Sequence, residues 1–547
     1  MKKQKKAARH KPAAKKTRKK LKTAVAGPMS ASPFAVEAAA PSTNETLGLA
    51  AAALQSDRPQ EALRLCGQVL SRDPGDTEAL NLAGVAAFQT GDGGQARELL
   101  ETALAFRPDF TDAHNNLGNV LEAQGLFVEA EASYRRCIAL NAGAAGAHFH
   151  LGNVLKALGR LGEAQAAYKC VLGIDPDNAE ALNNTGAVDM ELGRTTDAIH
   201  VYRKAVGINP GFAEAHYNLG IALQETGELK AALASYRRAL SSDSGHAGAQ
   251  INIGYAYKEM GRLEEAETAY RQAIRMAPDY DKVQVNLGDL YLQQGRPQAA
   301  VDLCDAYLTD HPGNISILAF KTIALSQRSS FDKASTLDEV RELYDFDRLL
   351  RPARPACPDG FADMADFNRA LGNHVLGHPS LSVQPTSHAT RFGRHSGELM
   401  VEPKGPVAAL ETVIRTAVED YRGMVPPDPA HPWLARRPDR MGLSVWGVAM
   451  DSQGHQLAHI HPSAWLSGVY YPKIPAVVRM DDPGHAGWIE FGRAPEDFHG
   501  PAQPEVRLIR PEEGLMVLFP SYFYHRTVPF ESGEVRISIA FDVLDAD

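Results

Sequence analysis

Residues 111–144 have the sequence TDAHNNLGNVLEAQGLFVEAEASYRRCIALNAGA, and residues 145–178 continue with AGAHFHLGNVLKALGRLGEAQAAYKCVLGIDPDN. The two segments place two glycines, an alanine and a tyrosine at the same positions, 34 residues apart. Continuing this register in both directions gives repeat starts at 43, 77, 111, 145, 179, 213, 247 and 281. The period is lost after Ser330. It therefore predicts an array of about eight helix pairs over residues 43–330.

The recurring columns of this register have physical reasons. The first glycine of each repeat and the alanine let paired helices approach closely. The second glycine lies between the two helices, where left-handed backbone is needed. A proline near the end of most repeats stops one repeat and starts the next. The two glycine columns are Gly84, Gly118, Gly152, Gly186, Gly220, Gly254 and Gly288, then Gly91, Gly125, Gly159, Gly193, Gly227, Gly261 and Gly295.

This pattern resembles the tetratricopeptide repeat, which implies an all-α superhelix with a concave binding surface. Asparagine recurs two positions before the first glycine, and in this family that position faces the concave side. A similar ladder in the repeats of O-linked N-acetylglucosamine transferases holds a peptide main chain. Amide side chains donate and accept hydrogen bonds, which suits a protein or peptide partner, although packing between helices would also explain them. The predicted peptide-binding residues are Asn116, Asn184, Asn218, Asn252 and Asn286.

Charge is unevenly distributed along the chain. Residues 1–23 contain twelve Lys or Arg and no acid, whereas the rest has 45 basic and 66 acidic residues. We expect residues 1–42 to be a basic disordered tail and linker, which either contacts nucleic acid or an anionic surface or only keeps the chain in solution. No apolar run approaches the roughly 20 residues of a transmembrane helix. Five cysteines without a CxxC pair indicate reduced thiols and a cytoplasmic protein.

The pattern changes in the C-terminal third of the chain. Residues 331–441 mix helical stretches with proline-rich segments and are predicted to be a helical or irregular lead-in. From Gly442 to residue 547 short β-like runs alternate with Gly, Pro and Asp loops, which predicts a sandwich or jelly-roll barrel. These runs are Gly442–Met450, Leu466–Lys473, Trp488–Phe491, Glu505–Ile509, Leu515–Phe519 and Val535–Val543.

Three histidines and one arginine in this region suggest a metal site. Side chains two apart on a strand share a face, so His459 and His461 can converge on one ion, and His525 can supply a third ligand. Arg536 and Ser538 also share a face, where a guanidinium and a hydroxyl suit a carboxylate. Histidine ligands beside a carboxylate clamp indicate a metal-dependent oxygenase pocket.

Together with the segment Ser467-Gly-Val-Tyr-Tyr471, these residues resemble the 2-oxoglutarate/Fe(II)-dependent oxygenases over about residues 440–545. HxHP followed by SGVYY is the order in a bacterial group often joined to such repeats. The resemblance implies an α+β domain with a double-stranded β-helix (jelly-roll) core, Fe(II) as cofactor and 2-oxoglutarate as cosubstrate. It also implies metal ligation by His459, His461 and His525, and cosubstrate binding by Arg536, Ser538, Tyr471 and Ser467.

The second metal ligand departs from this family's pattern. The wider superfamily has an HxD or HxE pair, and here His461 replaces the acid. Either His461 binds Fe(II), or it turns away and leaves an additional open position, or the site prefers Zn(II). A zinc hydrolase needs no 2-oxoglutarate clamp, so Arg536 and Ser538 favour the oxygenase.

The sequence therefore predicts a multi-domain enzyme, a 2-oxoglutarate- and Fe(II)-dependent dioxygenase that acts on a protein or peptide recruited by the repeats. One alternative is a tetratricopeptide scaffold with a non-catalytic barrel. Another is a small-molecule oxygenase that uses its repeats only for docking. A glycosyltransferase is excluded, because too few residues follow Ser330 for two nucleotide-binding halves and no Gly-rich strand-to-helix turn appears.

Overall fold

The computed structural model describes residues 42–329, 339–383, 389–496, 498–499 and 505–546. The chain forms two compact units, and the boundary between them lies between Ala249 and Gln250. Residues 1–41 of the predicted basic tail and linker lie outside the described residues. In the described part of the chain, no helix is both long enough and apolar enough to cross a membrane.

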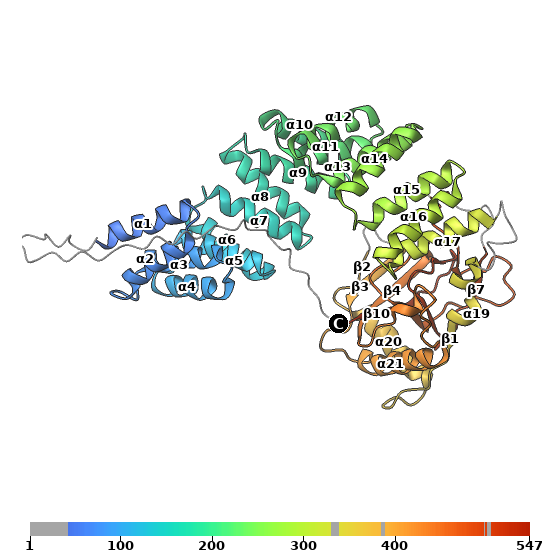
Figure 1. Cartoon of the computed structure of the whole chain (residues 1–547). Helices are drawn as coiled ribbons and strands as arrows, with labels where there is room; N and C mark the ends of the chain where they lie inside the picture. The colour runs from blue at the N-terminus through green and yellow to red at the C-terminus, as the bar shows by residue number, and fades with distance from the viewer. Residues whose placement is uncertain (1–41, 330–338, 384–388, 497, 500–504, 547) are drawn as a thin grey trace, which may run out of the picture. The chain divides into compact units, whose positions relative to one another are not determined.

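The first unit is a series of helix pairs, each pair packed on the next (Figure 1). Polar side chains cap several of the helices, as when Ser42 and Glu45 form a capping box at the start of the first. The helices are α1 (Thr43–Gln55), α2 (Pro59–Leu70), α3 (Thr77–Gln89), α4 (Gly93–Phe106), α5 (Thr111–Ala123), α6 (Phe127–Leu140), α7 (Ala145–Ala157), α8 (Leu161–Ile174), α9 (Ala179–Glu191), α10 (Thr195–Ile208), α11 (Ala213–Glu225) and α12 (Leu229–Ser242).

Both glycine columns do what the sequence predicts. A Cβ atom at Gly186 would lie 2.6 Å from Cε1 of Tyr202, the buried tyrosine of the paired helix. The other column has left-handed backbone, with φ of +72° at Gly193. The first glycine of a repeat therefore lets its two helices pack closely against the tyrosine. The second glycine allows the chain to turn from one helix to the next.

Replacing Gly186 with alanine is expected to destabilise the repeats. The added methyl would collide with the Tyr202 ring, and overpacking of this kind costs roughly 1–3 kcal/mol. The matched control is Gly207→Ala. Gly207 is an exposed residue of α10, and a Cβ atom there would meet nothing within 4 Å. This control should instead raise stability by up to about 1 kcal/mol, because alanine is the better helix former. Urea unfolding followed by helical circular dichroism compares them, and equal midpoints would contradict the packing role of Gly186.

The second unit begins with the last helices of the array and ends with the sheet-rich region. Helix α13 (Ala247–Glu259) crosses the unit boundary. The remaining helices are α14 (Leu263–Met276), α15 (Asp281–Gln293), α16 (Pro297–Asp310), α17 (Ile315–Ser329), α19 (Phe346–Leu349), α20 (Met364–Gly377), α21 (Val407–Met424) and the short 3-10 helix η1 (Leu434–Arg436).

Helix α15 contacts a loop of the sheet-rich region through Asp289. The carboxylate is buried, accepts a hydrogen bond from the His499 backbone N–H at 2.8 Å, and lies 2.5 Å from Lys258 Nζ. The ring of Phe320 on α17 packs against Phe498 of the same loop, with centroids 5.7 Å apart. The last repeats and the sheet-rich region therefore belong to one compact unit.

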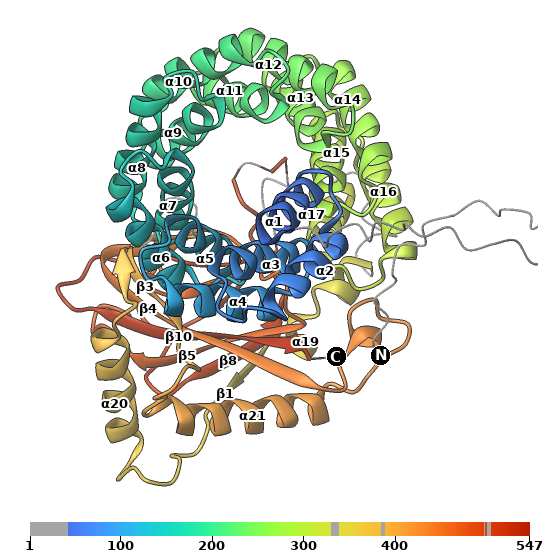
Figure 2. The same cartoon turned by 90° about the vertical axis from the view of Figure 1, so that its left-hand side faces the viewer.

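Within the described residues of this region, ten strands form two antiparallel sheets. The larger sheet has the order β1-β8-β5-β10-β4-β3-β2, and the smaller has the order β7-β6-β9. Helix α20 packs on β4 and β5, and Figure 2 shows α20 and α21 on the same side of the larger sheet. The strands are β1 (Arg351–Ala353), β2 (Ser382–Val383), β3 (Thr390–Glu398), β4 (Met441–Gln456), β5 (Leu466–Lys473), β6 (Ile489–Phe491), β7 (Arg507–Ile509), β8 (Met516–Pro520), β9 (His525–Thr527) and β10 (Arg536–Asp545).

The lead-in assigned to residues 331–441 is not separate from the sheet. Strand β1 pairs with β8, and β3 pairs with β4, so three strands from the lead-in extend the larger sheet at both edges. The sheet therefore begins before residue 442, the start expected for the jelly-roll core. The sequence does not reveal these strands, because β1 and β2 are too short to show a strand period and the nine residues of β3 do not alternate between apolar and polar side chains.

Candidate functional site

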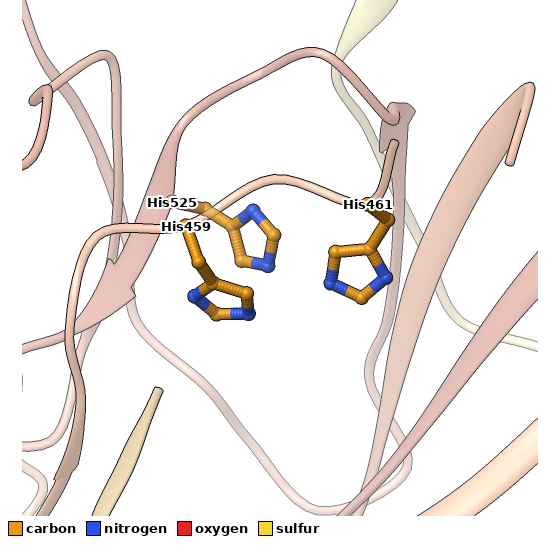
Figure 3. Close-up of side chains that lie close together, drawn as sticks. All are labelled: His459, His461 and His525. Carbon is orange, nitrogen blue, oxygen red and sulfur yellow. The ribbon is translucent and has the colours of Figure 1, made fainter. Parts of the chain in front are cut away.

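Three histidines meet where the two sheets approach each other. His525 begins β9, and the His459 backbone exchanges two hydrogen bonds of 3.1 Å with it. The His461 backbone N–H donates to Ser521 O, also at 3.1 Å. This stretch lies outside the named strands, but its extended pairing still directs both rings to one side. Figure 3 shows the rings of His459 and His525 facing that of His461 across a common space.

The ring nitrogens are arranged as a metal site requires. One nitrogen from each ring lies within 4.8 Å of the others. Each Nδ1 atom contacts an oxygen that can only accept: Leu457 O at 2.8 Å from His459, Asp542 Oδ1 at 2.7 Å from His461, and Phe523 O at 3.0 Å from His525. Nδ1 therefore carries the proton in all three rings, which leaves the Nε2 lone pairs free to bind an ion.

Burial also favours neutral imidazoles. Desolvation, together with the neighbouring His461 ring, lowers the pKa of His459 to about 3. Desolvation and the two adjacent imidazoles hold the pKa of His525 well below its ordinary value. Both imidazoles are thus neutral at pH 7, the state in which imidazole binds metals.

A cavity of about 300 Å³ opens beside the histidines, and a buried arginine lies in its wall. Arg536 is 1% exposed and its guanidinium lies 5.3 Å from the Tyr471 ring centroid. Among the described residues no acid pairs with it: its Nη1 contacts Met450 Sδ at 3.9 Å, and its Nε has no hydrogen-bond partner. Glu534, the nearby acid in the sequence, instead accepts a hydrogen bond from the Ala476 backbone N–H. Desolvation lowers the pKa of Arg536, and an anionic ligand would relieve the cost of this buried charge.

The other predicted cosubstrate residues fall into two groups. Tyr471 and Ser538 are buried and line the cavity beside Arg536. Ser467 is buried as well, but among the described residues it is not part of the cavity lining. Its hydroxyl contacts Asp542 Oδ1 at 2.7 Å and Ser521 Oγ at 2.8 Å. The structure thus directs Ser467 toward the support of His461 and away from the expected cosubstrate contact.

Asp542 is the residue that the sequence analysis missed. It lies on β10, two residues beyond Ala540, on the face that also presents Arg536 and Ser538 to the cavity. Continuing the period of two by one step would have placed it there. Its bond to His461, however, spans 81 residues of sequence and is visible only in the fold.

The asparagine ladder is partly occupied by contacts between repeats. Asn116 Nδ2 donates to Asn81 at 2.9 Å, and Asn218 donates to Asn183 at 3.0 Å. Asn184 donates to Asn153 at 2.9 Å. All five predicted ladder residues are half-buried. Each of these three amides therefore uses an N–H in a contact between repeats, which holds this part of the ladder in place.

Comparisons with known proteins agree with this arrangement. Residues 444–542 match a family described as "Putative 2OG-Fe(II) oxygenase". Tetratricopeptide-repeat families match residues 53–119, 113–144, 145–178, 186–227, 213–246 and 251–315. These matches give tetratricopeptide repeats within residues 53–315 followed by a C-terminal match to this oxygenase family, the architecture that the sequence predicts. A search of curated proteins finds no match.

Solved structures with similarity to the chain include MamA, YrrB and PilF. MamA is 24% identical, with a TM-score of 0.28 over 29% of this chain and 94% of its own. YrrB, titled a TPR protein with an unusual peptide-binding site, is 26% identical, with a TM-score of 0.30 over 34% of this chain and 96% of its own. PilF of Pseudomonas aeruginosa is 21% identical, with a TM-score of 0.35 over 39% and 97%.

Proposed function

We propose that the C-terminal domain is a 2-oxoglutarate- and Fe(II)-dependent dioxygenase that acts on a protein or peptide bound by the repeats. One observation carries the proposal: three imidazoles with free Nε2 atoms face one point, beside a cavity whose wall holds a buried arginine that pairs with no acid in the described part of the chain. A double-stranded β-helix core accords with this proposal, since the histidines come from between two antiparallel sheets.

The residues fit the metal that the family implies. Imidazole nitrogen is a good ligand for Fe(II), and the fixed tautomers present three of them. In this proposal His461 is a ligand, because its ring nitrogen belongs to the same cluster as those of His459 and His525. When bound, Fe(II) with 2-oxoglutarate supplies oxidative decarboxylation of the cosubstrate coupled to oxidation of a C–H bond.

The remaining residues bind and orient the cosubstrate. Arg536 would hold a carboxylate of the cosubstrate in a two-bond contact, and the hydroxyls of Ser538 and Tyr471 lie in the same cavity wall. Burial keeps water from competing for the guanidinium. A zinc hydrolase has no need of a carboxylate-binding guanidinium such as that of Arg536. The oxygenase is preferred for that reason.

The repeats supply substrate recognition in this proposal. Half-buried amides in successive repeats offer donors to an extended main chain without demanding a particular sequence. Two other functions give different results in the same assay. A scaffold with a non-catalytic barrel would turn over no 2-oxoglutarate, and a small-molecule oxygenase would not respond to peptides.

The test uses the full chain purified without oxygen. Fe(II) is added, oxygen is admitted, and succinate formed from 2-oxoglutarate is measured with and without peptides selected against the native chain from a random display library. Succinate that depends on Fe(II) and rises with peptide is expected. Stoichiometric Fe(II) binding without any succinate would refute the dioxygenase.

The asparagine ladder yields a separate prediction. Replacing Asn116, Asn184 and Asn218 together with alanine should weaken binding of the selected peptides by about tenfold or more, because each lost hydrogen bond contributes about 0.5–1.5 kcal/mol. The control is Asn141→Ala, which removes an amide from the turn between α6 and α7. Fluorescence anisotropy measures the affinity. Unchanged binding would assign the ladder to contacts between repeats alone.

A further inference from the structure

The three imidazoles of the cluster differ in what accepts their Nδ1 proton. His459 and His525 donate to neutral backbone carbonyls, whereas His461 donates to the carboxylate of Asp542 at 2.7 Å. The exception is the histidine that replaces the acidic ligand of related oxygenases. Three neutral imidazoles bring no charge to a metal, and a carboxylate one hydrogen bond away brings one negative charge.

The carboxylate of Asp542 is itself held in place. Its side chain is 13% exposed, and its Oδ1 also accepts a hydrogen bond from the Ser467 hydroxyl at 2.7 Å. Ser467 in turn contacts the buried Ser521 hydroxyl at 2.8 Å, and Ser521 O accepts the His461 backbone N–H. The histidine, the carboxylate and both serines form one closed network, which fixes the orientation of the His461 ring.

We propose that Asp542 is a positioning residue for His461. Because the three histidine ligands are neutral, Asp542 supplies through His461 the negative charge that an acidic ligand would bring to the metal. This role rests on the proposed function. The hydrogen bond fixes His461 with Nε2 toward the metal and makes that nitrogen a stronger donor. Asp542 thereby supplies negative charge that an acidic ligand would supply directly, but it does so through the hydrogen bond to His461.

The position of Asp542 on β10 agrees with this role. Arg536 and Asp542 lie on the same face of the strand and both line the cavity. An anionic cosubstrate is attracted toward Arg536 and repelled from Asp542. The carboxylate that supports His461 therefore also favours binding of the anion at Arg536.

The first measurement is the metal affinity of Asp542→Asn. The amide keeps the shape and can still accept a hydrogen bond but has no charge. Anaerobic competition between the full chain and a chromophoric chelator for Co(II), and then for Fe(II), should show a loss of about ten- to a hundredfold. The control is Asp481→Asn, which removes the same charge from a side chain that is 80% exposed and should leave the affinity unchanged. Thermal melting verifies that each variant is folded.

A second background separates a charge effect from a structural one. In His461→Asp the ligand is itself a carboxylate, so the metal receives a negative charge directly and the imidazole that links Asp542 to it is gone. There Asp542→Asn should change Co(II) affinity much less than it does in the native chain. Weakening by the same factor in both backgrounds, or no weakening in the native one, would overturn the role of Asp542.

Two further results are decisive. If His461→Asp binds no Co(II), Asp542→Glu takes its place, because glutamate keeps the charge and the acceptor. Affinity close to native supports the proposal, whereas affinity equal to that of Asp542→Asn overturns it. If the native chain binds neither Co(II) nor Fe(II), the proposed function fails, and the role of Asp542 fails with it.

Discussion

Replacing His525 with alanine is expected to remove stoichiometric metal binding from the chain. His525 is buried, its Nδ1 is committed to Phe523 O, and its ring lies 4.2 Å from His459 and 5.1 Å from His461 by centroid. Losing one of three ligands should weaken binding by more than the ten- to hundredfold typical of outer-shell changes, so by at least about a hundredfold. Metal content after anaerobic dialysis against Fe(II) measures the loss.

His455→Ala serves as the control for this variant. His455 lies on β4 near the site but is not part of the three-histidine cluster, and its Nδ1 contacts Gln453 O. It should bind iron like the native chain. Full iron occupancy in His525→Ala, and also in His459→Ala, would show that the cluster is not the metal site.

Replacing Arg536 with alanine should have the opposite profile, with metal retained and cosubstrate affinity lost. A bidentate guanidinium–carboxylate contact in a dry pocket contributes roughly 1.5–3 kcal/mol, which corresponds to about a ten- to hundredfold weaker affinity for 2-oxoglutarate. Lysine should not restore it, because an ammonium cannot form the two parallel bonds. Anaerobic titration of 2-oxoglutarate into the Fe(II)-loaded chain, followed by the metal-to-ligand absorption band, measures the dissociation constant.

Two variants guard this measurement against indirect effects. Arg536→Met keeps most of the buried volume while removing the charge, so a loss of affinity equal to that of the alanine variant excludes a collapsed cavity. Arg479→Ala removes an arginine that is 66% exposed and should bind 2-oxoglutarate normally. A native dissociation constant in Arg536→Met would mean that this cation is not the cosubstrate clamp.

The repeats were predictable because their constraints are local and recur. Tyr202 fills the space that Gly186 leaves open, and the same glycine–tyrosine pair recurs along the array. Aligning the repeats therefore shows both the period of 34 residues and the packing that explains it. The partners of the asparagines were less visible. Asn81 and Asn153 occupy different positions within their repeats, and only the packed helices show that each accepts from the ladder.

The metal cluster was predictable for a related reason. His459 and His461 are two residues apart in extended backbone, so their convergence follows from geometry within one short segment. The hydrogen-bond acceptor of His461 cannot be predicted from that segment, because Asp542 reaches it from another strand. Ser467 was placed in the cosubstrate pocket by resemblance, and its hydroxyl turned out to face Asp542 and Ser521.

The contact of Asp289 with His499 has a consequence for engineering the chain. A chimera that joins a foreign helical array to the sheet-rich region at residue 330 would discard α15, and with it the buried carboxylate that receives the His499 loop. The boundary between the two compact units lies upstream, between Ala249 and Gln250. The last two helix pairs and α17 should therefore be kept with the sheet-rich region when the repeats are exchanged.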